Sequence, residues 1–515
     1  MNTQSQATRV NAAPFISIRG ASILRAWRED DFWLVVLAGA VNVLGCAIKL
    51  TVGAHAPFWF DETFTGAFAA EPNLGAVVYQ ILHDQNAPAY YLIAHFTSLG
   101  FGLSDAALRF PALVFGLCAP FLCLLPTRSL SRRTRFVWFA LASLWTPALL
   151  YSQMARGYSL LFCLCIAATV AFIRLLDRPS VFRAALWGSV GGLAILTHYF
   201  ALFLIGVQGL VYLAARRERA LRTWPAALVF VPTFAWLLVH MSCLMQFVDS
   251  KNAWYDRLDG FHLAAVGFMF LGGAPIAFGT AALLLAVWRL APRPGVSGAA
   301  GEDRLGNAVA IAVLGTLLAL ALVLVIATLK PILTSRYLFP FAPGLLLGLA
   351  LMMERARSGL FRAAPFVLIG FYTCAAWNYS QETELQRRPM NYESASDDLM
   401  AAHVKHLAYL WDQPNNAIED RSQLVAAGKF FFARRGVDID VRPVQLRPGE
   451  DPNRSLIEAA GDKDAAILWL YDLSIHDTAA LTFPARIPEL DPSWGCRNYG
   501  EGRIGVVACV KKSGG

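Results

Sequence analysis

The chain has 515 residues, of which 56% are hydrophobic and only 16% are charged, and its mean hydropathy is +0.47. A soluble protein carries roughly a quarter charged residues, so this composition excludes an ordinary soluble protein and predicts a polytopic membrane protein. The formal net charge of +8 does not require a nucleic-acid partner, because basic residues accumulate in the cytoplasmic loops of membrane proteins.

Apolar runs of spanning length recur from the N-terminal region to residue 379. Eleven of them are expected to cross the membrane, at 33–52, 106–126, 135–151, 158–176, 182–197, 200–215, 222–247, 264–290, 307–329, 336–353 and 360–379. The predicted architecture is therefore an all-α membrane domain at 33–379. A cytoplasmic segment at 1–32 precedes it, and its first external loop covers 53–105.

Basic residues set the predicted orientation. Arginines cluster in the N-terminal segment and in alternate loops, at 128–135, 174–183, 216–222, 289–293 and 355–362. The positive-inside rule makes these loops and the N-terminus cytoplasmic. By contrast, the stretch 53–108 contains neither Lys nor Arg. We therefore expect the apolar segment 87–103 to lie in the outer interface without crossing, which puts the C-terminal part of the chain on the external side.

The last quarter of the chain, 380–515, lacks long apolar runs and holds more than half of the acidic residues. Helical patterns at 393–411 and 453–462 alternate with three strand-like runs, VDIDVRPV, AAILWLY and IGVVACV. This alternation predicts a small external α/β domain. Cys496 and Cys509 fall in it and could form a disulfide in an oxidising compartment, but their spacing alone does not establish one.

Polar residues gather at the external ends of the predicted spans. An acidic pair, Asp61 and Glu62, follows the first span, and later external segments supply cations and aromatic side chains. The further candidates are His83, Asp84, Asn86, Arg156, Tyr158, His198, Trp254, Tyr255, Arg336 and Tyr337. Because loops on one face can converge on a shared pocket, we expect one site at the membrane surface.

The residue types in this set suit a transfer reaction on a lipid phosphate. A carboxylate can deprotonate an acceptor hydroxyl or amine, and an arginine can hold a phosphate in bidentate fashion. A lipid-phosphate donor would keep its tail in the bilayer and present its headgroup at the surface. The sequence contains no P-loop and no Rossmann glycine pattern, so a soluble nucleotide-sugar donor is not indicated.

Five motifs, in this order, resemble the GT-C membrane glycosyltransferases: the pair Asp61 and Glu62, HDQNAPAYYL, YSQMARGYSLL, THYFALF and SRYLFPFAPGLLLGLA. They are most similar to bacterial members of glycosyltransferase family 39, related to the protein O-mannosyltransferases and the lipid A aminoarabinose transferases. The likeness covers most of the membrane domain. Two departures concern the acceptor: Gln85-Asn86-Ala87 stands where many relatives have Pro-Pro, and Gly157 stands where proline is common after the arginine.

The resemblance implies a polyprenyl-phosphate-linked sugar, such as an undecaprenyl phosphate sugar, as the donor. It also implies an envelope acceptor (a glycan, lipid or protein) and inversion at the anomeric carbon. The reaction would take place at the outer face of the bacterial inner membrane. Neither the sugar nor the acceptor is named by the sequence.

The resemblance also implies roles for the candidate residues. Asp61 matches the family's catalytic base, and Glu62 is the second acid, which would orient the acceptor or support Asp61. Donor-pocket positions are matched by His83, Arg156, His198 and Arg336, with Tyr158 and Tyr337 beside them, and acceptor or sugar contacts are assigned to Asp84, Asn86, Trp254 and Tyr255. Some GT-C enzymes bind a divalent cation beside the acidic pair, so Mg²⁺ or Mn²⁺ near Asp61 and Glu62 stays an open alternative.

Other interpretations apply to the same residues. Asp61 could be an ordinary helix N-cap, because Phe60, Phe64 and Phe68 recur at the spacing of an interfacial helix. Arg336 could reach lipid headgroups, and His198 could be a structural hydrogen-bonding residue. For the whole chain, the competing functions are a transporter or flippase of an amphipathic substrate and a GT-C-like scaffold without catalysis. The absence of an internal repeat argues against a transporter.

Overall fold

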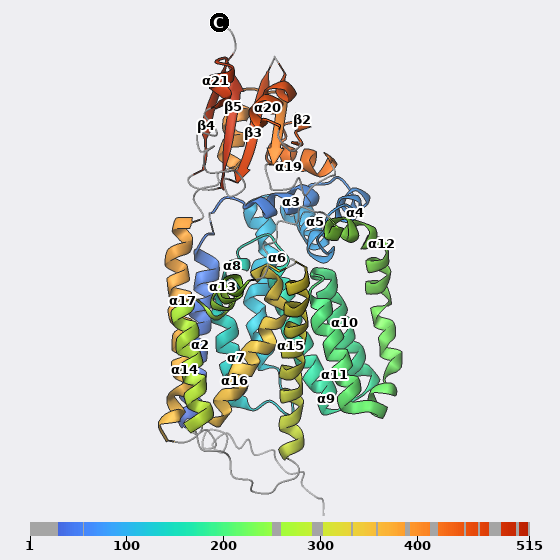
Figure 1. Ribbon diagram of the computed structural model, residues 1–515, viewed down its shortest axis with the longest axis vertical. Helices are drawn as coiled ribbons and strands as arrows, with labels where there is room; N and C mark the ends of the chain where they lie inside the picture. The colour runs from blue at the N-terminus through green and yellow to red at the C-terminus, as the bar shows by residue number, and fades with distance from the viewer. Residues whose placement is uncertain are drawn as a thin grey trace, which may run out of the picture.

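The computed structural model describes residues 29–54, 56–249, 259–290, 302–330, 333–356, 359–386, 392–411, 421–446, 450–461, 464–472, 486–500 and 504–512. Long helices form a bundle, a small sheet domain covers one end of it, and three short helices lie between the two (Figure 1). A helical domain followed by a C-terminal sheet domain confirms the predicted fold class.

The bundle is built from helices that are apolar around most of their surface. Its helices are α2 (Glu29–Thr51), α6 (Asp105–Cys118), α7 (Arg132–Leu144), α8 (Thr146–Tyr151), α9 (Tyr158–Asp177), α10 (Val181–Thr197), α11 (Ala201–Leu221), α12 (Val231–Asp249), α13 (Gly260–Leu271), α14 (Ala274–Leu290), α15 (Glu302–Leu329), α16 (Ala342–Met352) and α17 (Ala364–Gln386). In the described part of the chain, six helical segments are long and apolar enough to cross a membrane, and two apolar helices are shorter. The chain is therefore a multi-pass membrane protein.

Short 3₁₀ segments extend several of these helices. They are η1 (Ala119–Leu124), η2 (Trp224–Phe230), η3 (Ser335–Phe341), η4 (Met353–Arg355) and η5 (Gly359–Ala363). The segment η3 leads directly into α16 and carries Arg336 at the helix entrance. The sequence placed a single apolar run at 336–353, and the structure divides that run between a tight 3₁₀ turn and an α-helix.

Two predicted spans are each two helices in the structure. The run at 135–151 is interrupted at Trp145, whose ψ of 113° is not helical, and Pro147 then opens α8. The run at 264–290 is interrupted by Gly272 and Gly273, whose φ values of 93° and 102° lie in the left-handed region. The apolar composition continues through both breaks, and for that reason hydropathy alone missed them.

The first external loop folds into three short helices between the bundle and the sheet domain (Figure 1). They are α3 (Phe60–Ala69), α4 (Leu74–Leu82) and α5 (Ala89–Phe101). Helix α5 has 13 residues and ends at Gly102, whose φ is 79°. At 1.5 Å per residue it is about 20 Å long, short of the roughly 30 Å of a bilayer core. This length agrees with the expected interfacial position of 87–103.

Several basic loops contact one another at the end of the bundle farther from the sheet domain. Arg174 donates to the carbonyl of Pro126, and Arg216 donates to the carbonyl of Leu176. Arg133 of α7 donates to the carbonyl of Ala356, which follows η4. The arginine clusters that the sequence assigned to one side of the membrane therefore include loops that meet in space.

The C-terminal domain is a five-stranded mixed sheet with the strand order β2-β1-β3-β5-β4. Its elements are α18 (Tyr392–Ala401), β1 (His406–Trp411), α19 (Arg421–Ala433), β2 (Asp440–Pro443), α20 (Pro452–Ala460), β3 (Ala465–Asp472), α21 (Arg486–Leu490), β4 (Trp494–Asn498) and β5 (Ile504–Lys511). Strands β2, β1 and β3 are parallel, whereas β5 runs antiparallel to β3 and to β4. The prediction of a C-terminal α/β domain is thus confirmed.

One detail of that prediction is wrong. The sequence indicated a single helix at 393–411, but the helix ends at Ala401 and residues His406–Trp411 form the strand β1. His403, with φ of 54°, ends the helical path. β1 lies between β2 and β3 and is buried on both faces. A strand that is buried on both faces has an uninterrupted apolar run, and hydrophobic periodicity alone cannot distinguish such a run from a buried helix.

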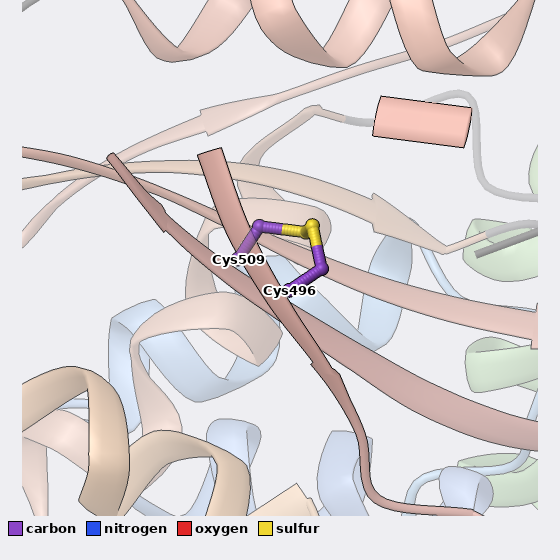
Figure 2. Close-up of a disulfide and its surroundings, with 2 residues drawn as sticks. All are labelled: Cys496 and Cys509. Atoms are coloured by element: carbon purple, nitrogen blue, oxygen red, sulfur yellow. A yellow bond between two sulfur atoms is a disulfide. The ribbon is translucent and has the colours of Figure 1, made fainter. Parts of the chain in front are cut away.

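Cys496 and Cys509 form a disulfide that joins β4 to β5 (Figure 2). The two residues stand directly opposite each other in the antiparallel register of these strands. The sequence left this pairing open, and the strand register is what brings the two sulfur atoms together. A disulfide of this kind is typical of an oxidising compartment.

Only one face of the sheet has a hydrophobic core that is formed within the sheet domain alone. One face packs with α20 and α21 around Trp469 and Trp494. The other face packs with α18 and α19, and its buried residues are continuous with those of the first external loop, including Phe58 and Phe68. The predicted domain boundary at 379/380 lies inside α17, which continues to Gln386. The external loop and the sheet domain therefore share one hydrophobic core.

Candidate active site

The acidic pair occupies the first turn of α3. The helix begins after Trp59, whose backbone is extended, and Glu62 folds back to accept a hydrogen bond from the Trp59 amide at 2.9 Å. This is the carboxylate half of a capping box, which satisfies a backbone donor that a helix start leaves unpaired. The sequence therefore places Asp61 and Glu62 at a rigid helix N-terminus, where negative charge is also favoured by the helix dipole.

Glu62 is 1% exposed, and both of its carboxylate oxygens are occupied. Arg109 of α6 forms a bidentate ion pair with it, Nε to Oε1 and Nη2 to Oε2, each at 2.8 Å. The Ala155 amide donates to Oε1 at 2.7 Å. The same Arg109 donates to the carbonyl of Ala56 at 2.7 Å. Glu62 thus joins the start of α3, helix α6 and the loop before α9, and its place in the structure is that of a support for Asp61.

Asp61 lies beside two arginines that are remote in sequence. Its Oδ2 is 2.8 Å from Nη1 of Arg336 and 4.0 Å from Nη2 of Arg156. The Asp61 side chain remains 25% exposed, unlike that of Glu62. Burial alone would raise the pKa of Asp61, but the charges of Arg336 and Arg156 and the hydrogen bond from Arg336 outweigh it and lower that pKa. Asp61 is therefore ionised at neutral pH, and part of its side chain is accessible from outside.

Arg156 connects Asp61 to the segment after α4. Its guanidinium donates to the Asp61 carbonyl at 3.2 Å, to the Tyr91 hydroxyl at 3.3 Å and to Oδ1 of Asn86 at 3.3 Å. Asp84 in turn accepts hydrogen bonds from Tyr91 at 2.6 Å and from Asn86 at 3.0 Å. The predicted contacts Asp84 and Asn86 thus belong to the same polar network as Asp61 and Arg156.

A cavity opens beside this network. Polar and aromatic side chains line it, together with the backbone of Gly157; the lining residues are Thr65, Asn86, Ala87, Tyr90, Tyr91, Arg156, Gly157, Tyr158, Thr197 and His198. Aromatic faces with a few hydroxyl, amide and guanidinium groups are suited to a sugar ring or a phosphate. Four of the predicted residues, Asn86, Arg156, Tyr158 and His198, meet at this cavity.

His198, which follows the end of α10, packs against aromatic rings of the site. Its ring centroid is 5.1 Å from that of Tyr337 and 5.7 Å from that of Tyr158. Burial and the charges of Arg336 and Arg156 lower the pKa of His198 to about 3, so the imidazole is neutral at physiological pH. A neutral imidazole can donate or accept a hydrogen bond beside the arginines without adding to their charge.

Of the remaining predicted residues, His83 does not line the cavity, and two others fall outside the described part of the chain. His83 ends α4 as an exposed residue, where its Nδ1 lies 2.8 Å from the Tyr79 carbonyl and its ring packs on the ring of Tyr79. It is absent from the residues that line the described cavity. Trp254 and Tyr255 lie outside the described residues.

Arg109 is the main residue that the sequence interpretation missed. It lies inside the predicted span 106–126, and a charged residue in an apolar run is itself a signal of a buried partner. Tyr91 was also missed as an individual residue, although it belongs to the HDQNAPAYYL motif. Its hydroxyl bridges Asp84 and Arg156, a role that only the packing of α5 against the loop before α9 reveals.

The donor set around the acidic pair does not fit a divalent cation. Both oxygens of Glu62 face Arg109 and backbone amides, and the Asp61 carboxylate faces Arg336. Within the described ranges, no group of three or more His, Cys, Asp or Glu side chains is placed to hold a metal. The carboxylates of Asp61 and Glu62 are already neutralised by the side chains of Arg336 and Arg109.

Comparison with known proteins defines the class of fold: the chain has the GT-C fold of membrane glycosyltransferases, with a soluble domain at its C-terminus. It is similar to the crystal structure of ArnT from Cupriavidus metallidurans in the apo state, with a TM-score of 0.53 and 13% identity over 92% of this chain and 97% of that chain. The structure of the same ArnT bound to undecaprenyl phosphate has a TM-score of 0.53 at 12% identity, with the same coverage. No protein-family model matches the chain, and no curated protein does.

Proposed function

We propose that the protein is an inverting glycosyltransferase that moves a sugar from a polyprenyl-phosphate carrier to an envelope acceptor. The observation that carries the proposal is the position of Asp61. It is an ionised, partly exposed carboxylate held between Arg336 and Arg156, beside a polar and aromatic cavity, at the end of the bundle that faces the sheet domain.

The proposed reaction is a single displacement. Asp61 accepts the proton of the acceptor hydroxyl or amine, and the freed electron pair forms a bond to the anomeric carbon. The bond between that carbon and the phosphate oxygen breaks, and its electron pair leaves with the polyprenyl phosphate. Arg156 and Arg336 hold the phosphate and stabilise the charge that it gains. Attack opposite the leaving group inverts the anomeric configuration.

A lipid-phosphate donor is supported by two features. The cavity is lined by Arg156 and by residues of α3, α5 and α9, which belong to the external loop and the bundle, so we propose that a headgroup enters it while its tail stays in lipid. The similar ArnT structure is one bound to undecaprenyl phosphate. We therefore propose undecaprenyl phosphate sugars and membrane lipid as the first partners to test, with an envelope glycan, lipid or protein as the acceptor and no nucleic acid.

We place the site on the periplasmic face of the bacterial inner membrane, with the N-terminus in the cytoplasm. The positive-inside pattern supports this orientation, because basic loops meet at the opposite end of the bundle. The disulfide between Cys496 and Cys509 also supports an oxidising compartment for the sheet domain.

Replacement of the base tests the proposal. Purified protein incubated with undecaprenyl phosphate sugars and candidate acceptors is expected to release undecaprenyl phosphate. Asp61→Asn should lower the rate by about 10²–10⁴-fold, the usual contribution of a general base. Asp440→Asn, which changes an exposed carboxylate of the sheet domain, should keep the wild-type rate. Undiminished release by Asp61→Asn would refute the assignment, and no turnover with any donor would favour a transporter or a non-catalytic scaffold.

A further inference from the structure

Helix α19 of the sheet domain packs directly on α3, the helix that carries Asp61. The contact is closest at Gly66, where a Cβ atom would stand only 2.4 Å from the ring of Phe430. Phe430 also stacks on Phe58, with ring centroids 5.9 Å apart and ring planes 6° apart. Gly66 lies one turn after Glu62 on the same face of α3. Phe430 therefore contacts the face of α3 that also carries the buried Glu62 carboxylate.

Ion pairs continue this contact onto α6. Arg434, at the end of α19, pairs with Asp105 of α6 at 2.6 Å and also with Glu393 of α18. Asp105 lies one turn before Arg109 on α6, and the Arg109 guanidinium lies 4.9 Å from the ring centroid of Phe58. Helix α6 therefore binds Glu62 through Arg109 and also binds α19 through the ion pair of Asp105 with Arg434.

The rest of the interface is apolar and largely buried. Phe64 of α3 lies 4.7 Å from the ring of Trp411, measured between centroids. Gln423 of α19 donates to the carbonyl of Gln80 on α4 at 3.1 Å. Buried residues of α3, α19 and the inner face of the sheet form one continuous cluster.

We propose that α19 is a positioning element for the active site, with Phe430 and Arg434 holding α3 so that Asp61 stays aligned with Arg336 and Arg156. The proposal rests on the function proposed above, and it gives the sheet domain a part in catalysis that needs no catalytic residue of its own. Phe430 and Arg434 act through α3 and α6 and do not contact the substrate.

The length of α3 gives the physical reason. It has ten residues, and a helix of this length is only marginally stable in water without tertiary packing. Its first turn is held by the bond network of Glu62, and one turn further along the same face it is covered by α19 at Gly66. A displacement of about 1 Å at a catalytic group can cost about 10²-fold in rate, so the support at both turns of α3 matters for Asp61.

A size-exchange experiment on the full-length protein tests the contact. Gly66→Ala places a methyl group where the Phe430 ring lies, so kcat should fall about 10–100-fold with a smaller change in KM. Phe430→Leu removes the ring atoms that crowd this position, so the double variant Gly66→Ala, Phe430→Leu should recover to within a few-fold of wild type. Gly100→Ala on α5 is the matched control, because nothing lies within 4 Å of its new Cβ.

Hydrogen exchange gives a readout that does not depend on catalysis. Amides of residues 60–69 should exchange faster in Phe430→Ala and in Arg434→Gln than in wild type, and Arg434→Lys should restore part of the protection. A double variant as impaired as Gly66→Ala, or unchanged exchange at 60–69, would overturn the proposal. If the wild-type protein transfers no sugar at all, the proposed function fails, and the exchange measurement alone then decides whether α19 holds α3.

Discussion

At the scale of single residues, the two neighbouring acids have different environments, and this difference is the basis for the different roles proposed for them. Glu62 is buried with a bidentate arginine and two backbone amides, whereas Asp61 is partly exposed and faces two arginines that other elements supply. A buried carboxylate with all of its acceptor sites filled has little capacity left for a substrate. The neighbouring carboxylate, held in place by the first, keeps that capacity.

The buried pair gives a prediction about Arg109. Arg109→Gln leaves the Glu62 charge buried without its partner, so we expect a loss of about 3–5 kcal/mol in stability and a strong loss of transfer. Arg109→Lys keeps the charge but cannot form the bidentate pair, and it should give an intermediate loss. Thermal unfolding in detergent, together with the transfer rate, measures both. Wild-type unfolding and transfer in Arg109→Gln would show that the pair does not support the site.

The pH dependence of the reaction follows from the surroundings of Asp61. Activity requires the ionised carboxylate, so the rate is lost as the pH falls through its lowered pKa. Arg336→Gln removes a charge and a hydrogen bond that lower this pKa, so the acidic limb of kcat/KM against pH should move to higher pH. Arg497→Gln, in the exposed pair with Asp398, should leave the limb in place. A limb that moves to lower pH in Arg336→Gln would contradict the role of Arg336.

At the scale of elements, small residues decide how closely helices approach. Gly344 and Gly348 lie one turn apart on α16, and both face α15. A Cβ at Gly344 would stand 2.1 Å from Oγ1 of Thr316, and one at Gly348 would stand 3.2 Å from Cγ1 of Val313. In a membrane, where lipid tails are as apolar as the side chains, close helix contact of this kind is a main source of association. The α15–α16 contact also fixes η3, which carries Arg336 into the site.

Gly344→Ala tests this packing. The added methyl group overlaps Thr316, so we expect a loss of about 1–3 kcal/mol in stability, seen as a lower unfolding temperature in detergent. Gly370→Ala on α17 meets nothing within 4 Å and should leave the unfolding temperature unchanged or slightly raised, because alanine favours a helix more than glycine does. Equal behaviour of the two variants would mean that the close approach of α15 and α16 is not required.

At the scale of the whole molecule, the two ends of the bundle differ: one carries the basic loops, and the other carries the sheet domain with its disulfide. Basic loops contact one another at one end of the bundle, and the sheet domain with its disulfide covers the other (Figure 1). Asp61 and its arginines lie between the bundle and the sheet domain. A single orientation in the membrane therefore accounts for both the loop charges and the disulfide.

Cysteine labelling tests that orientation. Asp438, which is 97% exposed on the sheet domain, and Glu218, exposed near the end of α11, are suitable sites in a chain whose exposed Cys118 and Cys374 are changed to serine. A membrane-impermeant maleimide should label Asp438→Cys in intact spheroplasts and Glu218→Cys only after permeabilisation. The reverse pattern would place the site in the cytoplasm and remove the argument for an envelope acceptor.

The sequence by itself determined the class of the molecule and most of the site's members. Burial of apolar side chains depends mainly on composition and order, so the membrane domain, the α/β domain and the shared position of Asp61 and Arg336 at one end of the bundle could be predicted from hydropathy, loop charge and motifs. The breaks at Trp145 and Gly272 and the strand β1 could not, because an apolar run has the same hydropathy whether it bends, stops or pairs.

Only the tertiary structure decided which of the external residues meet. Arg336 is 275 positions from Asp61 in the chain. Arg109 lies within a predicted span, and only the structure reveals its ion pair with Glu62. The motif predicts His83 in the donor pocket, and in the structure its ring packs on that of Tyr79 at the end of α4. Long-range contacts depend on the relative packing of many helices, and no local pattern encodes that packing, so the different environments of Asp61 and Glu62 became clear only in three dimensions.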